Sequence, residues 1–130
     1  MPLKKIAIRM QNVILAEGII MALRENGNFI PYKLSAAKMA DTVTDCEALH
    51  PDILLMSVSY SPEENIERCL AICEAVHKSL PKCKTVFICD ENSYPDLARK
   101  VVSAKENGII DSFFYSSVSG KYLSDALYAL

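Results

Sequence analysis

Short apolar segments alternate with longer amphipathic segments along the whole chain, and this alternation constrains the fold more than any other feature. The short segments have the length and apolar character of buried strands, whereas the longer segments place apolar residues at helical spacing. Strands are predicted at Lys4–Arg9, Phe29–Leu34, Ile53–Ser57, Lys84–Cys89 and Ile109–Tyr115. Helices are predicted at Val13–Arg24, Ala36–Leu49, Ser61–Leu80, Pro95–Asn107 and Ser119–Leu130.

This order of elements predicts an α/β fold of the (βα)5 type, a doubly wound, five-stranded parallel sheet with helices on both faces. Apolar residues make up 51% of the 130 residues, which suits one domain spanning residues 1–130 with a sizeable core. No internal repeat or low-complexity linker interrupts it. The last helical pattern reaches Leu130 without a cap, so we expect this domain to be the N-terminal part of a longer protein.

Local signals mark the ends of several predicted elements. Gly27 follows the first helix and suits a left-handed C-terminal cap. Pro31 favours an edge position for the second strand, because proline lacks the N–H that a central strand needs. Ser35 can cap the second helix. Ser61 is predicted to cap the third helix, with Glu64 completing a capping box.

Charge and hydropathy exclude two classes of partner for this segment. The formal net charge is −2, from 14 basic and 16 acidic residues, so the segment has no electrostatic basis for binding nucleic acid. No apolar run approaches the length of a bilayer span, and Met1–Lys5 leads into a strand rather than a signal peptide. We therefore expect a cytoplasmic protein without membrane contact.

The five cysteines are better explained as core residues than as ligands or disulfides. Their number is odd, no C-x-x-C pair occurs, and Cys69 and Cys73 fall on the apolar stripe of the third predicted helix. A zinc site would need more ligands nearby, and the spacing of His50 and His77 fits no common pattern. We expect small buried hydrophobic residues and no metal centre.

The chain lacks the glycine-rich loops that bind phosphate groups. Such loops need glycine because backbone N–H groups must approach the anion closely. The chain has 4 glycines, and none of them builds a G-x-G-x-x-G or P-loop motif. The turn at Met10–Val13 also lacks the small hydroxyl residues that a flavin phosphate favours. No nucleotide or flavin cofactor is therefore expected.

Four short segments share their order and spacing with one known family. They are Leu15–Ile19 (LAEGI), Pro51–Leu55 (PDILL), Asn107–Phe114 (NGIIDSFF) and Leu123–Leu127 (LSDAL). Together they resemble the receiver (CheY-like) domain of bacterial response regulators, most closely the LuxR/NarL type. The resemblance implies a flavodoxin-like strand order of 2-1-3-4-5 and a role in two-component signal transduction and transcription regulation. It also implies a helix-turn-helix DNA-binding domain after this segment.

The residues that carry phosphorylation in the resembled family are replaced in this chain. Met10 and Gln11 stand where two acidic residues hold Mg²⁺, and Ser57 stands at the phosphoacceptor aspartate. Cys89 replaces the threonine or serine after the fourth strand, and Tyr115 replaces the lysine after the fifth. Mg²⁺ prefers carboxylate oxygens, and phosphoryl transfer needs cationic charge near the transferred group. The resemblance therefore implies a pseudo-receiver that has lost Mg²⁺ binding and is not an enzyme.

Such a domain is expected to act through contact with a protein partner or a second copy of itself, and to reach DNA only through a further domain. On the first helix, the predicted core side holds Leu15, Gly18, Ile19, Ala22 and Leu23. Val13, Ala16 and Ile20 fall roughly opposite, where an exposed apolar strip would indicate an interface. The alternative is that a neighbouring helix covers this strip and makes the buried face broad. A second candidate surface joins the fourth helix, fifth strand and fifth helix. The candidate interface residues are Val13, Ile20, Met21, Arg99, Lys100 and Tyr122.

Two other functions stay open. A small-molecule sensor would use the crevice at the strand ends, which the sequence predicts to be lined by Met10, Gln11, Ser57, Ser59, Cys89 and Tyr115. A cryptic enzyme or redox switch would use Ser57 or Cys89. The sequence places neither histidine to act as a base for Ser57, and no evident cation to lower the pKa of Cys89.

Overall fold

The computed structural model describes residues 3–35, 38–90, 92 and 94–130. Within them the strands are β1 (Lys4–Arg9), β2 (Phe29–Leu34), β3 (Ile53–Ser57), β4 (Lys84–Cys89) and β5 (Ser112–Tyr115). The helices are α1 (Val13–Asn26), α2 (Met39–Leu49), α3 (Ile66–Ser79), α4 (Pro95–Glu106) and α5 (Gly120–Tyr128), and a 3₁₀ turn, η1, covers Pro62–Glu64. No helix in the described ranges is both long and apolar enough to cross a membrane.

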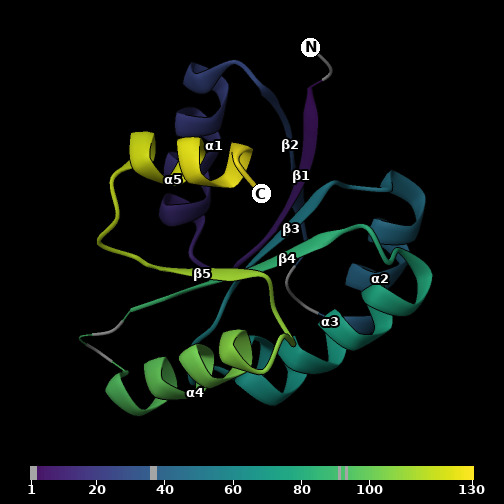
Figure 1. Cartoon of the computed structure of the whole chain (residues 1–130), viewed down its shortest axis with the longest axis vertical. Helices are drawn as coiled ribbons and strands as arrows, with labels where there is room; N and C mark the ends of the chain where they lie inside the picture. Colours follow the sequence, from purple (N-terminus) through teal and green to yellow (C-terminus); the bar gives the residue numbers. More distant parts are fainter. Residues whose placement is uncertain (1–2, 36–37, 91, 93) are drawn as a thin grey trace.

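The strands form one parallel sheet of five strands in the order β2-β1-β3-β4-β5. Figure 1 shows α1 and α5 over one face of the sheet and α2, α3 and α4 over the other. Alternate residues of β3 enter separate cores: Leu54 and Met56 pack under α2, α3 and α4, and Ile53 and Leu55 pack under α1 and α5. The predicted fold class, the strand order and the edge position of β2 are confirmed.

The predicted start of the second helix is wrong. The helix begins at Met39, with Lys38 in the N-cap position, so Ser35 is not its cap. The backbone at Lys38 is still extended (φ −129°, ψ 139°), because the chain must first pass from the sheet edge to the face that α2 covers. Residues 36 and 37, where the prediction begins the helix, lie outside the described residues.

The predicted start of the third helix is also wrong. Asn65 has an extended backbone (φ −66°, ψ 154°) and separates η1 from α3. Its side chain accepts a hydrogen bond from the Arg68 N–H at 2.8 Å and so caps α3 in place of Ser61. Glu64 does not complete a capping box, because its carboxylate accepts from Gln11 in the loop after β1 and from Ser59 in its own loop.

The fifth strand begins at Ser112 rather than Ile109, because the preceding residues complete the end of α4. Gly108 has a left-handed backbone (φ 74°), and the Ile109 N–H donates to the Ala104 carbonyl at 2.9 Å. The left-handed cap predicted at the end of α1 is confirmed, since Gly27 has φ 82° and its N–H donates to the Leu23 carbonyl.

The buried side of α1 differs in part from the prediction. Ala16, Ile19 and Leu23 are buried, whereas Gly18 is exposed. The prediction has Ala16 and Gly18 on the wrong sides, because the apolar pattern of a helix does not specify the directions from which its neighbours pack. In the structure α5 packs against α1 as well, and Ala22 lies at that contact.

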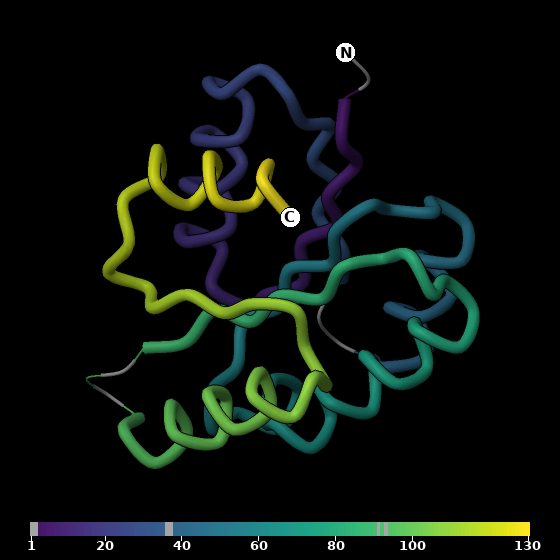
Figure 2. The backbone as a smooth tube through the Cα atoms, viewed as in Figure 1, coloured from purple at the N-terminus to yellow at the C-terminus, as the bar shows by residue number. Residues whose placement is uncertain are grey.

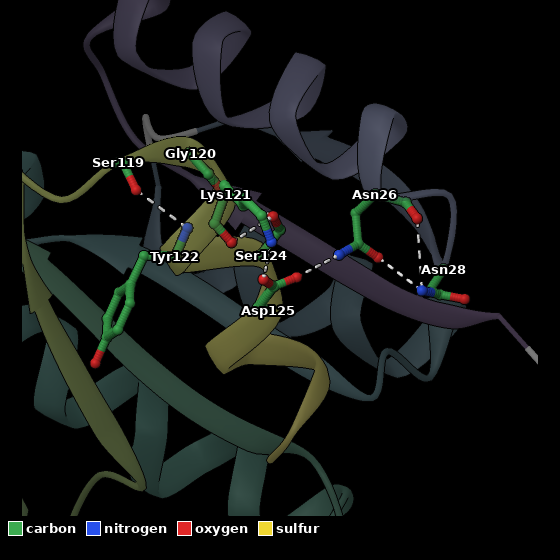
Figure 3. Close-up of polar contacts among 8 residues, drawn as sticks. All are labelled: Asn26, Asn28, Ser119, Gly120, Lys121, Tyr122, Ser124 and Asp125. Atoms are coloured by element: carbon green, nitrogen blue, oxygen red, sulfur yellow. Dashed lines mark hydrogen bonds and ion pairs between the residues drawn. The ribbon is translucent and has the colours of Figure 1, made fainter.

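The contact between α1 and α5 combines close packing with polar bonds (Figure 3). A Cβ atom added to Gly120 would lie 2.8 Å from the Ala22 Cβ, so the first turn of α5 needs glycine there. The Asn26 side-chain amide donates to the Asp125 carboxylate at 3.1 Å. Asp125 also accepts from the Lys121 ammonium at 2.8 Å, which orients its carboxylate. These contacts hold α5 beside α1.

The far end of α5 is held by the first strand. The Lys4 ammonium donates to the Tyr128 carbonyl at 2.5 Å and to the Leu130 carbonyl at 3.1 Å. A cation at the C-terminal end of a helix also interacts favourably with the helix dipole. Figure 2 shows this arrangement, with the yellow end of the tube beside the purple first strand.

The two glycines at Gly18 and Gly120 predict opposite responses to alanine. Gly120→Ala forces its new methyl group against Ala22 and should lower the free energy of unfolding by about 1–3 kcal/mol. Gly18→Ala meets no atom within 4 Å and should raise that energy by about 0.5–1 kcal/mol, through better helix propensity. Urea denaturation measures both changes. Equal changes in the two variants would contradict the close approach of the helices.

Candidate functional site

The strand register brings the ends of four strands to one edge of the sheet. Arg9 pairs with Met56, Ser57 pairs with Ile88, and Cys89 pairs with Tyr115. A cleft of about 520 Å³ opens at this edge, and we call it the strand-end cleft. Its position agrees with the general rule that parallel α/β sheets place ligand sites at the carboxyl ends of strands.

The cleft contains most, but not all, of the lining predicted from the sequence. Gln11, Ser57, Ser59 and Cys89 line it. Met10 does not, because its side chain is buried in the core under α1 and α5.

Tyr115 does not line the strand-end cleft either. Its ring packs edge-on against Phe113, with 5.6 Å between ring centroids. The side chain lines a separate groove beside Ala98 and Arg99 of α4. The prediction is therefore wrong for Met10 and Tyr115 as lining residues: side-chain direction at a strand end depends on packing that the strand pattern does not specify.

A buried carboxylate, which the sequence interpretation missed, connects two loops at the cleft. Glu64 is 5% exposed, and its two carboxylate oxygens accept from the Gln11 N–H at 2.7 Å and the Ser59 hydroxyl at 2.9 Å. The Gln11 side chain accepts from the Ser61 hydroxyl at 2.6 Å and donates to Glu63 at 3.0 Å. We call Gln11, Ser59, Ser61, Glu63 and Glu64 the loop clasp. It ties the loop after β1 to the loop after β3.

A buried cation accompanies this buried anion. Arg9, at the end of β1, is fully buried, and its Nε donates to the Thr42 hydroxyl of α2 at 2.9 Å. Burial lowers the pKa of the Arg9 guanidinium, and the negative charge of Glu64 acts in the opposite direction. An arginine keeps its charge at neutral pH even so. The charges of Arg9 and Glu64 therefore interact, although Arg9 is not among the residues that line the cleft.

One sequence signal could have located Glu64. The segment from Ser61 to Asn65 contains two residues that can cap a helix, and only the first was considered. A helix starting after Asn65 leaves Glu64 in the preceding turn, where its side chain is free to point back to the sheet edge. Which cap is used depends on the partners of Glu64, of which Ser59 is near in the sequence and Gln11 is 53 residues away.

Acidic and aromatic side chains also line the strand-end cleft, beside the apolar residues Leu15, Val58 and Ile88. Asp90, Tyr94 and Ser116 join Glu64 in the lining. Tyr60 packs edge-on against Tyr94, with ring centroids 4.6 Å apart and an interplanar angle of 68°. Among the residues that the structure describes, none of the side chains lining this cleft is Lys, Arg or His.

The thiols have the character of core residues, as predicted from their spacing. All five cysteines are buried, and none of them forms a disulfide bond. Burial raises the pKa of Cys46 to about 11 and the pKa values of Cys69, Cys73 and Cys83 to about 12. Cys89 lines the cleft but is 2% exposed, so reagents in solution have little access to its sulfur. These thiols are poor nucleophiles in the folded chain.

Neither histidine lies among the cleft residues, where it could activate Ser57. The His77 Nε2 lies 3.5 Å from the Thr85 hydroxyl, near the start of β4, and His50 caps α2 with a left-handed backbone. Within the described part of the chain, no group of three or more His, Cys, Asp or Glu side chains is arranged to hold a metal ion.

The candidate interface residues lie on two separate surfaces. On α1, Val13 and Met21 are exposed, and Ile14, which the prediction omits, is the most exposed of these apolar side chains at 83%. Ile20 is half-buried against the core. On the other surface Arg99 pairs with Asp96 and Lys100 is exposed. Tyr122 is exposed on α5, with its ring edge-on to Phe114.

Solved structures identify the fold. No protein-family model and no curated protein matches the chain. The signal receiver domain of NarL from Mycobacterium tuberculosis matches with a TM-score of 0.74 and 12% identity, over 99% of this chain and 96% of that one. A CheY-like receiver domain from Methanospirillum hungatei matches with a TM-score of 0.74 and 16% identity, over 98% and 92%. A LuxR-family DNA-binding response regulator from Staphylococcus aureus matches with a TM-score of 0.71 and 13% identity, over 98% of both chains. The chain has the receiver fold.

The buried carboxylate of Glu64 predicts a loss of stability on truncation. Glu64→Ala leaves the Gln11 N–H and the Ser59 hydroxyl without this acceptor, and it removes the anion near Arg9. We expect the free energy of unfolding to fall by about 2–4 kcal/mol in urea denaturation. The control Glu74→Ala removes an exposed carboxylate on α3 and should change it by less than about 0.5 kcal/mol. Similar small effects at both positions would contradict the loop clasp.

The raised thiol pKa values predict weaker folding in alkaline solution. Above the ordinary thiol pKa of 9.0, cysteines of the unfolded chain ionise while the buried thiols stay protonated, so rising pH favours unfolding. The stability that the folded chain gains from its protonated thiols is fully present below pH 9.0 and is lost as pH rises towards 11 to 12. Urea midpoints should fall between about pH 8 and about pH 10.5. Cys73→Ala should make the decrease of the urea midpoint with pH shallower. An unchanged pH dependence would contradict its assignment to the buried thiols.

Proposed function

We propose that the chain is a degenerate receiver domain that acts in signal transduction through phosphorylation-independent contact with other proteins. The observation that carries the proposal is the loop clasp. The clasp lies at the sheet edge where a working receiver holds Mg²⁺ and its phosphoryl group. There the Glu64 carboxylate accepts a hydrogen bond from the loop after β1, and the Gln11 side chain forms hydrogen bonds with the loop after β3. Gln11, which stands at the position of a metal-binding acidic residue, is thereby used to hold the two loops together.

The donor set at this edge does not fit Mg²⁺. Mg²⁺ demands oxygen ligands in near-octahedral geometry. Met10 offers a buried thioether, and the Gln11 amide oxygen already accepts from Ser61. Neither residue can therefore replace the metal-binding acidic pair.

Phosphoryl transfer also lacks its other usual parts. Ser57 has no histidine beside it among the described cleft residues, and Tyr115, at the position of the usual lysine, faces away from the cleft. Transfer depends on cations that neutralise the oxygens of the phosphoryl group. The described lining carries two carboxylates and no basic side chain, which would repel a phosphoryl donor instead.

The proposed output is a protein contact, either with a different partner or between two copies of the chain. Exposed apolar side chains on α1, namely Val13, Ile14 and Met21, support a contact surface there. Two of the structural neighbours are NarL and a LuxR-family DNA-binding response regulator. By analogy, we propose a role in transcription regulation in a bacterial cytoplasm, with DNA bound through a separate domain rather than by this one.

A second candidate function is small-molecule sensing, favoured by the size of the strand-end cleft. Its volume of about 520 Å³ lies within the range of ligand sites in proteins. Polar groups from several elements converge on it, including Gln11, Ser57 and Ser116. A ligand bound there would contact the loops after β1, β3 and β4 together, and so could alter the neighbouring surfaces.

If the chain has lost phosphorylation, it should not react with phosphoryl donors. Incubation with acetyl phosphate and Mg²⁺ should leave the intact mass unchanged, and beryllofluoride with Mg²⁺ should leave the amide NMR spectrum unchanged. Ser57→Asp should stay equally inert, because restoring one acidic residue supplies neither the metal ligands nor the lysine. A phosphorylatable receiver in the same buffers verifies the reagents. Stoichiometric mass gain by the unaltered chain would refute the proposal.

A further inference from the structure

The strand-end cleft carries acidic side chains and lacks basic ones among the described residues. Glu64 and Asp90 both line it, and among the described residues no Lys, Arg or His does so. Arg9 lies behind the clasp, fully buried and bonded to Thr42, and is not among the lining residues. The chemistry of the cleft therefore favours a positively charged occupant over a phosphate or carboxylate.

Helix N-termini near the cleft do not reverse this preference. The Asn12 side chain caps α1 by accepting from the Leu15 N–H at 3.0 Å, and the Gln11 N–H donates to Glu64. At α4 the first residue is Pro95, which has no N–H. An anion would have to displace the cap or the clasp to reach these N–H groups.

One wall of the cleft is aromatic. Tyr94 lines it, and the ring of Tyr60 supports Tyr94 edge-on at a centroid distance of 4.6 Å. A cation near an aromatic ring is attracted by the ring quadrupole, most strongly when the site is partly desolvated. The hydroxyl groups of Ser57, Ser59 and Ser116 also line the cleft and can accept hydrogen bonds from an N–H donor.

We propose that the strand-end cleft binds a small organic ammonium ion, with Glu64 and Asp90 as its acidic walls and Tyr94 as its aromatic contact. An ammonium group can hydrogen-bond to a second lone pair of a carboxylate oxygen that already accepts one bond, as both oxygens of Glu64 do. An inorganic divalent ion is a poorer match, because it needs several oxygen ligands at once in fixed geometry. The cleft volume of about 520 Å³ suits an amine that carries an aromatic or aliphatic body.

This inference deepens the second candidate function and rests on that function alone. Binding is measured on the isolated chain, without a phosphoryl donor or a protein partner. A negative result would remove the ammonium site and leave the loss of phosphorylation untouched.

The experiment is an amide NMR titration with probes matched in shape and opposite in charge. Phenethylammonium is the cation and 3-phenylpropionate is the anion, with choline, spermidine and MgCl₂ as further probes. We expect saturable shifts centred on Gln11, Ser59 and Tyr94 with the organic cation, and none with the anion. MgCl₂ at the same concentration should not reproduce them.

Two variants distinguish binding of the cation in the cleft from its general attraction to a negatively charged protein. Asp90→Asn keeps the shape of the side chain and its acceptor for the Asn92 N–H, and should weaken phenethylammonium binding about tenfold. Glu74→Gln removes an equal charge on the outer face of α3 and should leave the affinity unchanged. The proposal is overturned if none of the organic cations binds saturably, if the anion or Mg²⁺ binds as well, or if Asp90→Asn binds like the unaltered chain.

Discussion

The parallel pairing of β3 between β1 and β4 is the constraint on which the rest of the structure depends. Because alternate residues of β3 enter two separate cores, this strand fixes the position of helices on both faces at once. The same pairing sets Ser57 level with Ile88 and Arg9 level with Met56. The loops after these strands must then meet at one edge, and the chemistry of that edge follows from which side chains they carry.

At that edge the chain stabilises itself with a buried carboxylate instead of preparing a metal site. Glu64 bonds to the loop after β1 and to Ser59, and the buried guanidinium of Arg9 attracts its carboxylate electrostatically. Burying a carboxylate without hydrogen bonds and a nearby cation would be strongly unfavourable. The clasp is therefore a structural element first. It also leaves the neighbouring cleft acidic, which separates its chemistry from that of a phosphate site.

Much of the fold could be predicted because strand and helix patterns are local. Hydrophobic periodicity located the five strands and five helices, and Gly27 marked the end of α1 correctly. Helix starts were less predictable, since Ser61 and Asn65 are both good caps by local criteria. Asn65 caps α3, and this leaves Glu64 its hydrogen bonds to Gln11 and Ser59, residues on two separate loops. The orientation of α1 was mistaken for a similar reason, because α5 covers a second side of it.

The sequence by itself determined the order of elements, the parallel sheet and the residue types at the strand ends, because these depend on periodicity and on position along the chain. Only the tertiary structure decided which of those residues share a cleft. Gln11, Ser57 and Cys89 line it, while Met10 is buried beneath and Tyr115 turns towards α4. Glu64, Asp90 and Tyr94 enter the lining from loops and helix starts. Their positions depend on hydrogen bonds and ring contacts between distant segments, which no local pattern encodes.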